Sequence, residues 1–387
     1  MAVPVPALPS QNGALTRHRR SLSALTGIRF FAAFLVVIFH SRVGAVLTGH
    51  GLPYAGNFFA NCYMAVTLFF ILSGFILAYT YRSQIETSRH RLHFWQARFA
   101  RIWPAYVLSL LCTSIPSFTI PPPGRTLATL LMVQAWNPLH PAYAGDWNFA
   151  CWTLSVEALF YLTFPWFQVW LERLSRRWLV VAGALLLCGS IAARIPEKGL
   201  DALYTGVFRF IPLPVIFLPI FLLGAVLGNL YLECAAGKPL RDRGLFTWFG
   251  LFALVLALCF PRMSPATSFV LIGYSLFVYG LAAETSLVSR FLSTPALVLG
   301  GGMSYSIYLM QLPVRMWVKA GIAAANGEDG LRNMATVVFV LLLVSWIIFR
   351  FVEEPARKWL RAKFAAADRK FEQPGEVFIA GTPGSTS

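Results

Sequence analysis

An arginine and a histidine lie in one long apolar stretch near the start of the chain, in the segment GIRFFAAFLVVIFH. Arg29 and His40 are eleven residues apart. In an α-helix this spacing is about 1100°, or three turns plus roughly 20°, so both side chains project from one face, about 16 Å apart along the axis. Ionisable side chains inside a bilayer are costly and are therefore functional candidates. Taken singly, Arg29 also fits an interfacial residue, and His40 a hydrogen-bonded packing residue.

Two more polar residues are expected at the depth of His40. Glu157 and Gln311 lie in later apolar stretches, and counting 1.5 Å per residue places both near the same level, within about 3–6 Å. A histidine beside a carboxylate is an arrangement suited to general acid–base chemistry. The sequence alone leaves contact among the three side chains open.

A second candidate site is basic and lies in the run RHRLHFWQARFARIWP. Arg98 and Arg101 are three residues apart and share a helix face. The planar guanidinium binds phosphate through two hydrogen bonds, so these residues predict an anion site. The same run also fits an ordinary basic cytoplasmic loop with interfacial aromatics. It further contains Arg89, Arg91, His93, Phe94, Trp95 and Trp103.

The composition explains what must hold these residues in place. The 387 residues are 57% hydrophobic and 12% charged, whereas charged residues make up about a quarter of soluble domains. The apolar residues fall in runs of roughly 18–25 positions, long enough to cross a bilayer. The net charge of +16 is carried by short clusters between these runs, which indicates a lipid bilayer rather than nucleic acid as the partner.

We therefore predict an all-α fold, a polytopic transmembrane helical bundle of about ten spans with both termini cytoplasmic. With that orientation, 21 of the 32 Lys and Arg residues fall on the inner side and nine on the outer side. The predicted parts are a cytoplasmic segment 1–20, a transmembrane domain 21–364 and a disordered cytoplasmic tail 365–387. The predicted spans are 26–45, 61–81, 99–119, 150–171, 178–194, 210–232, 245–261, 267–283, 295–318 and 333–352.

The chain resembles the acyltransferase-3 family of membrane O-acyltransferases over about residues 20–360. Six segments match in the family's order, and they include the Arg29–His40 pair. The other five are TLFFILSGFIL (67–77), ARFARIWPAY (97–106), WTLSVEALFYLTFP (152–165), SYSIYLMQLP (304–313) and FVEEPARKWL (351–360). The opening LTGIRFFAAFLVV is similar to acyltransferases of antibiotic-producing actinomycetes, including macrolide acyltransferases.

The resemblance implies an enzyme of the cell membrane that transfers an acyl group from acyl-CoA to a hydroxyl of a sugar, glycan or small molecule. It implies His40 and Glu157 as catalytic residues and Arg29, Arg98 and Arg101 as acyl-CoA-binding residues. Substrate-binding or supporting roles then fall to Ser73, Trp152, Thr153, Tyr305 and Gln311. The sequence departs from the family at Ala158, where an acidic residue is usual, at Thr153, where serine is usual, and at Gln311, where histidine is usual.

The expected mechanism places the phosphates of CoA at the inner arginines and its pantetheine arm along the face shared by Arg29 and His40. His40 is then the general base for the acceptor hydroxyl, and Glu157 either orients His40 or holds the acceptor. No metal and no tightly bound cofactor are expected. The alternatives are a glycan or lipid transporter or flippase, and a receptor or scaffold without chemistry.

Overall fold

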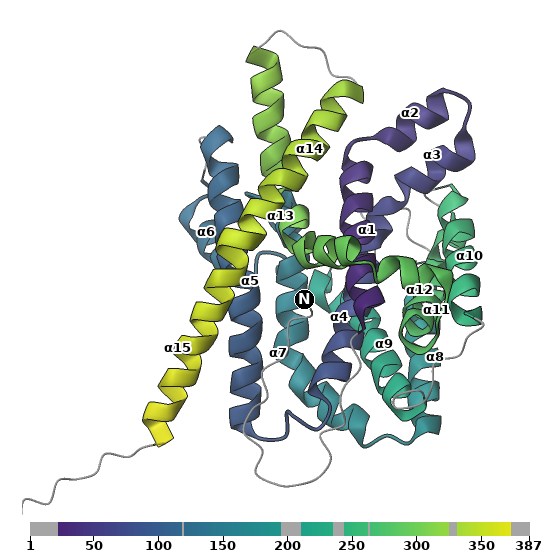
Figure 1. Ribbon diagram of the computed structural model, residues 1–387, viewed down its shortest axis with the longest axis vertical. Coiled ribbons are helices and arrows are strands. Elements are labelled where there is room, and N and C mark those ends of the chain that lie inside the picture. Colours follow the sequence, from purple (N-terminus) through teal and green to yellow (C-terminus); the bar gives the residue numbers. More distant parts are fainter. Residues whose placement is uncertain are drawn as a thin grey trace, which may run out of the picture.

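The structure is a computed structural model that describes residues 22–117, 120–194, 210–234, 244–261, 264–324 and 331–372. These residues form helices joined by short turns, and none of the described residues belongs to an extended strand. The prediction of an all-α fold is therefore confirmed. The longer helices gather into one bundle, while α2 (Val43–Gly49) and α3 (Pro53–Ala60) form a hairpin at one end of it (Figure 1).

Five helical stretches among the described residues are long and apolar enough to cross a membrane. They are Ser23–His40, Pro53–Tyr81, Leu213–Cys234, Pro265–Ala283 and Met334–Ala366. These stretches agree with the prediction of a helical membrane protein. Each of the ten predicted spans lies largely on helix, but ten crossings and cytoplasmic termini stay predictions. The segments 1–20 and 373–387, which carry the two termini, lie outside the described residues.

Two predicted boundaries are wrong. The first helix, α1 (Ser23–His40), ends five residues before the predicted end of the first span. Ser41 hydrogen-bonds back to the carbonyl of Val37, and Arg42 then takes a left-handed backbone conformation (φ 57°), which turns the chain into α2. The last helix, α15 (Glu354–Glu372), continues through residues 365–372, which we assigned to the disordered tail.

The bundle is centred on α4 (Ala65–Tyr81) and α9 (Leu213–Cys234), which pack closely along one another. A side chain on Gly74 would meet the backbone of Phe221, and one on Gly224 would meet the backbone of Ile71. Small residues at such positions allow two membrane helices to approach until their backbones touch. The sequences of α4 and α9 therefore favour this pairing.

Two further helices complete the central layer. Helix α7 (Trp152–Glu172) packs against α9, and Phe160 stacks on Phe221 at a centroid distance of 4.6 Å. Helix α13 (Pro295–Ala324) packs along α1, where a side chain on Gly301 would meet the backbone of Thr26. Helix α5 (Ser88–Ser117) lies against α7 and α13, so it places its arginines beside both.

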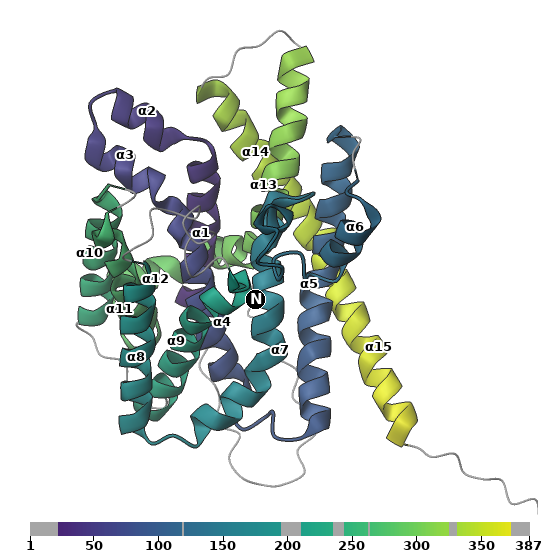
Figure 2. The same cartoon turned by 180° about the vertical axis from the view of Figure 1, so that it is seen from behind.

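The remaining helices lie around this centre. Helix α8 (Arg176–Arg194) packs on α9, and α10 (Leu245–Cys259) packs on α11 (Val270–Ala283) at the opposite edge from α5 (Figure 2). Short helices α6 (Pro123–Leu130) and α12 (Leu287–Leu292) connect longer ones. Helix α14 (Leu331–Ile348) continues into α15 through a π-helical turn, Phe349–Glu353, and α15 runs beside α5 (Figures 1 and 2).

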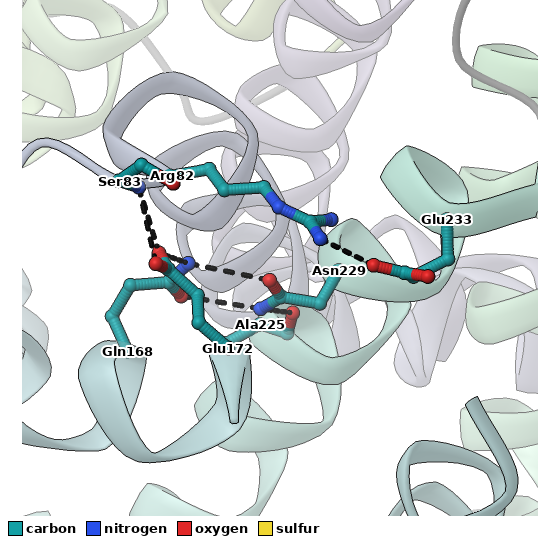
Figure 3. Close-up of polar contacts among 7 residues, drawn as sticks. All are labelled: Arg82, Ser83, Gln168, Glu172, Ala225, Asn229 and Glu233. Atoms are coloured by element: carbon teal, nitrogen blue, oxygen red, sulfur yellow. Dashed lines mark hydrogen bonds and ion pairs between the residues drawn. The ribbon is translucent and has the colours of Figure 1, made fainter. Parts of the chain in front are cut away.

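A buried amide pair joins α7 to α9 near one end of the bundle (Figure 3). The side chains of Gln168 and Asn229 each donate to the oxygen of the other, at 3.3 and 3.2 Å. Gln168 also donates to Glu172, and the Glu172 carboxylate accepts from the backbone N–H of Ser83 at 3.0 Å. Beside them, Arg82 forms an ion pair with Glu233. The contacts attach the turn between α4 and α5 to α7 and α9, upstream of the arginines of α5.

Candidate active site

The largest group of polar side chains surrounds a cavity of about 130 Å³ between α1, α4, α5, α7 and α13. We call it the arginine cavity. Apolar residues of α4 form much of its wall, and its polar groups come from all five helices. The polar lining residues are Arg29, Ser73, Arg98, Arg101, Thr153, Glu157, Tyr161, Ser304, Tyr305 and Tyr308.

The arginine cavity brings together three guanidinium groups and one carboxylate among its described lining residues. Arg98 donates to the hydroxyl of Tyr81 at 3.3 Å, and its guanidinium lies over the Tyr81 ring. The Nε of Arg98 is buried and has no hydrogen-bond partner within the described chain. Because a buried donor without a partner is costly, this arrangement is suited to an anionic ligand that accepts from it. Arg29 and Arg101 add two positive charges.

The carboxylate of the cavity is that of Glu157, which accepts a 2.8 Å hydrogen bond from the hydroxyl of Tyr161. Tyr161 lies one helical turn further along α7 and is itself within 3.4 Å of Ser73. Electrostatic interactions connect Glu157 with Arg29 and Arg101. Sequence reasoning missed Tyr161, although its spacing of four residues from Glu157 could have identified it.

A second carboxylate near the cavity was also missed. Glu353 is buried, with 2% of its surface exposed, and accepts a 3.0 Å hydrogen bond from Ser306 of α13. Electrostatic interactions connect it with Arg101 and Arg29. Glu353 belongs to the motif FVEEPARKWL, so the two adjacent glutamates of this motif could have identified it as a candidate from the sequence.

His40 lies in a different, smaller cavity of about 70 Å³, which we call the histidine cavity. The Nδ1 atom of His40 is 2.9 Å from the carbonyl oxygen of Val36 and 3.0 Å from Oε1 of Gln311. Arg315, one helical turn beyond Gln311, donates to the backbone carbonyl of His40. The lining residues are Val37, His40, Ser41, Phe149, Ala150, Gln311, Leu312, Arg315 and Val337.

The two cavities lie along one seam between α1 and α13. Arg29 lines its cavity with Ser304, Tyr305 and Tyr308, and His40 lines the other with Gln311 and Arg315. Both side chains thus face α13. They therefore share one face of α1, which their spacing predicted. However, the two cavities share no lining residue, so the described chain has two separate cavities here rather than the single groove that we expected to link Arg29 to His40.

Tyr308 lies at the boundary between the two cavities. Its side chain lines the arginine cavity, and its hydroxyl is joined to Thr153 by a 3.1 Å hydrogen bond. Its backbone carbonyl accepts from the amide nitrogen of Gln311 at 2.9 Å. Glu157 lies on the Arg29 side of this boundary and Gln311 on the His40 side. Three residues were predicted at one depth. His40 and Gln311 are in contact, whereas Glu157 accepts from Tyr161 and does not contact His40.

The predicted supporting residues divide between the cavity and the packing around it. Ser73, Thr153 and Tyr305 line the arginine cavity, where the Tyr305 hydroxyl donates to the carbonyl of Ile102 at 2.8 Å. Trp152 is not among the lining residues and packs edge-to-face on Phe70.

The basic run also divides. Arg98 and Arg101 line the cavity, whereas Arg91 donates to the carbonyls of Ile85 and Glu86 and lies over the ring of Trp166. Arg89 and His93 are not among the lining residues, nor are the aromatic residues Phe94, Trp95 and Trp103.

The apolar helices and the cavities between them describe a helical membrane protein with ionisable side chains inside its bundle. A family model described as an acyltransferase domain matches residues 22–350. The chain therefore belongs to the acyltransferase-3 family, as its motifs predicted.

Two relatives illustrate the similarity. Acyltransferase MdmB of Streptomyces mycarofaciens is 32% identical over 188 residues, which cover 43% of this chain and 45% of that protein. O-acetyltransferase OatA of Staphylococcus aureus (strain MRSA252) is 24% identical over 385 residues, which cover 92% of this chain and 60% of that protein. The matched regions thus span less than two thirds of either relative. No solved structure matches the chain.

Proposed function

We propose that this protein is an O-acyltransferase of the cell membrane that transfers an acyl group from acyl-CoA to a hydroxyl of a sugar or glycosylated small molecule. Membership of the acyltransferase family supports the type of reaction. The observation that carries the choice of donor is the arginine cavity, in which Arg29, Arg98 and Arg101 surround a space between helices.

Acyl-CoA suits this cavity because its phosphates are anions and its thioester arm is long and flexible. Guanidinium groups bind phosphate through paired hydrogen bonds, which are stronger than neutral ones. The buried Nε of Arg98 offers a donor that the described chain leaves unused. In this proposal the phosphates bind at the three arginines, and the pantetheine arm follows the α1–α13 seam past Tyr308 towards His40.

His40 acts as the base in the proposed reaction. It takes the proton of the acceptor hydroxyl while the hydroxyl oxygen attacks the thioester carbonyl carbon. The C–S bond then breaks, an ester forms, and the CoA thiolate receives the proton from His40. Glu157, on the other side of Tyr308, belongs with the donor: its carboxylate, which accepts a hydrogen bond from Tyr161, offsets part of the positive charge of the arginines. Glu157 does not orient His40 in this proposal, because the partners of His40 are Val36 and Gln311.

For the acceptor we propose a macrolide or similar glycosylated natural product, with a role in antibiotic biosynthesis. The support is the opening segment LTGIRFFAAFLVV together with the similarity to a Streptomyces acyltransferase. The departure from the family's histidine at Gln311, next to His40, also sets this chain apart at the position nearest the proposed base.

The test uses full-length protein in lipid nanodiscs with acetyl-CoA and either a glycosylated macrolide or a free sugar. Release of CoA thiol together with acetylation of the acceptor, seen by mass spectrometry, supports the proposal. The His40→Ala variant should lose about 10²–10⁴-fold in turnover and still bind CoA. Transport of the acceptor into vesicles without any covalent change would instead identify a transporter, and full turnover by His40→Ala would remove His40 as the base.

A further inference from the structure

The hydrogen bonds of His40 determine which of its ring nitrogens carries the proton. The two partners of Nδ1 are the carbonyl oxygen of Val36 at 2.9 Å and Oε1 of Gln311 at 3.0 Å. The orientation of the Gln311 amide is set independently, because its nitrogen donates to the carbonyl of Tyr308 at 2.9 Å. Its oxygen must therefore face His40.

Both partners of Nδ1 are acceptors, so Nδ1 carries hydrogen and the neutral ring holds its lone pair on Nε2. The Nε2 atom has no hydrogen-bond partner within the described chain, and the ring belongs to the wall of the histidine cavity. The carbonyl of Val36 also belongs to the hydrogen-bond ladder of α1. Gln311 is thus the side-chain acceptor that serves the ring and connects it to α13.

We propose that Gln311 is a positioning residue, which holds His40 with its proton on Nδ1 so that Nε2 is the base facing the acceptor. The inference rests on the proposed acyl transfer. Gln311 takes the place that a carboxylate holds in hydrolytic triads, but with a neutral group. The lining of the histidine cavity contains no carboxylate among the described residues, so Gln311 is the side chain there that accepts from Nδ1. The Arg315 guanidinium bonds to the backbone carbonyl of His40 and leaves the ring free.

The reaction step makes the role explicit. The acceptor O–H proton passes to Nε2, and the imidazolium charge that results is stabilised by the Gln311 and Val36 oxygens that accept from Nδ1. After the C–S bond breaks, the same proton leaves Nε2 for the thiolate. Gln311 neither gains nor loses a proton. In this proposal it acts through the orientation and charge of His40.

Two variants separate positioning from packing. Gln311→Met has nearly the same volume but no acceptor, whereas Gln311→Glu keeps an acceptor oxygen and adds a charge beside Arg315. For positioning, kcat falls about 10–100-fold in Gln311→Met with little change in KM for acetyl-CoA, while Gln311→Glu keeps most of its kcat. If Gln311 only fills space, Gln311→Met should keep more of its kcat than Gln311→Glu does. That reversal would overturn the proposal.

A second measurement does not depend on turnover. In ¹⁵N-histidine-labelled protein, with the His40 signals assigned by comparison with His40→Gln, NMR reports which ring nitrogen is protonated. We expect Nε2 to be unprotonated in the wild-type protein and the two tautomers to mix in Gln311→Met. A proton on Nε2 in the wild-type protein would overturn the inference. If the nitrogen assignment holds and no acceptor is acylated, the proposed reaction fails and the orientation of His40 by Gln311 stands.

Discussion

The surroundings of the Arg98 side chain give the strongest indication of a bound anionic ligand. It stacks on Tyr81, bonds to the hydroxyl of the same tyrosine, and leaves a buried Nε without a partner in the described chain. Proteins seldom leave a buried charged donor unsatisfied unless a ligand completes it. The same helix carries Arg91, whose guanidinium is bonded to backbone carbonyls away from the cavity. The two arginines therefore form a natural pair for comparison.

Replacing Arg98 by alanine should weaken CoA binding by about 10–100-fold, the effect of losing a hydrogen bond to a charged group. The difference in CoA affinity between the wild-type protein and the variant should narrow as salt is added, because screening reduces the electrostatic attraction that Arg98 contributes. Titration calorimetry with CoA in nanodiscs measures both. Arg91→Ala is the control and should change the affinity by no more than about two-fold. Equal losses in both variants would argue against the arginine cavity as the CoA site.

The sequence predicted the face shared by Arg29 and His40 because both lie on one helix, where spacing determines direction. It could not predict which residue contacts His40. That contact depends on how far α7 and α13 are turned about their own axes, and an uncertainty of about 3–6 Å in depth is as large as a side chain. The position of Tyr308 at the boundary between the two cavities could not be predicted for the same reason.

At the scale of helices, the approach of α4 to α9 places Gly224 against the backbone of Ile71. Gly224→Ala should therefore destabilise the protein by about 1–3 kcal/mol, because the added methyl group meets backbone that must shift. Gly189 of α8 is the matched control, since a Cβ there meets nothing within 4 Å. Gly189→Ala should leave the melting temperature unchanged or raise it slightly, because alanine favours helix. Thermal unfolding followed by tryptophan fluorescence distinguishes them, and equal melting temperatures would contradict the close packing.

The amide pair of Gln168 and Asn229 gives a second prediction at this scale. Gln168→Leu leaves a buried amide of Asn229 without its cross-helix partner and should cost about 1–2 kcal/mol. The double variant Gln168→Leu with Asn229→Leu should recover part of that loss, because no polar group is then stranded. Melting temperatures of the two single variants and the double variant form a complete cycle. Strictly additive losses would show that the two amides do not depend on each other.

At the scale of the whole molecule, the two ends of the bundle differ. One end carries the turn between α4 and α5 with the amide pair, and the other carries the α2–α3 hairpin (Figures 1 and 3). Among the described residues, Arg82, Arg89 and Arg91 lie in or just after the turn at the first end, and Arg173 follows Glu172 there, so we predict that this end faces the cytoplasm.

In a cysteine-free variant expressed in intact cells, Gly49→Cys should react with a membrane-impermeant maleimide. Gln84→Cys should react only after the cells are permeabilised. Both residues are exposed, so access depends on the side of the membrane rather than on burial. The opposite labelling pattern would reverse the predicted orientation.

Long apolar runs identified the helices of this fold, since their length and composition are local properties. How the helices are arranged relative to one another could not be predicted from these local properties. The turn at Arg42, which ends α1 early, depends on a positive φ at a residue that is neither glycine nor asparagine. Likewise α15 extends past residue 365 because no proline or glycine lies between Pro355, in its first turn, and Pro374.

The π-helical turn at Phe349–Glu353 has a consequence for how the chain tolerates insertions and deletions. A π turn holds one residue more than an α turn, so everything after it is rotated by about 100° relative to an uninterrupted α-helix. Glu353 closes this turn, where it accepts from Ser306 and lies near Arg101. Losing a single residue between 349 and 352 would restore ordinary winding, move Glu353 away from Arg101 and leave Glu157 as the carboxylate beside the arginines. This stretch can therefore exchange side chains far more freely than it can change length.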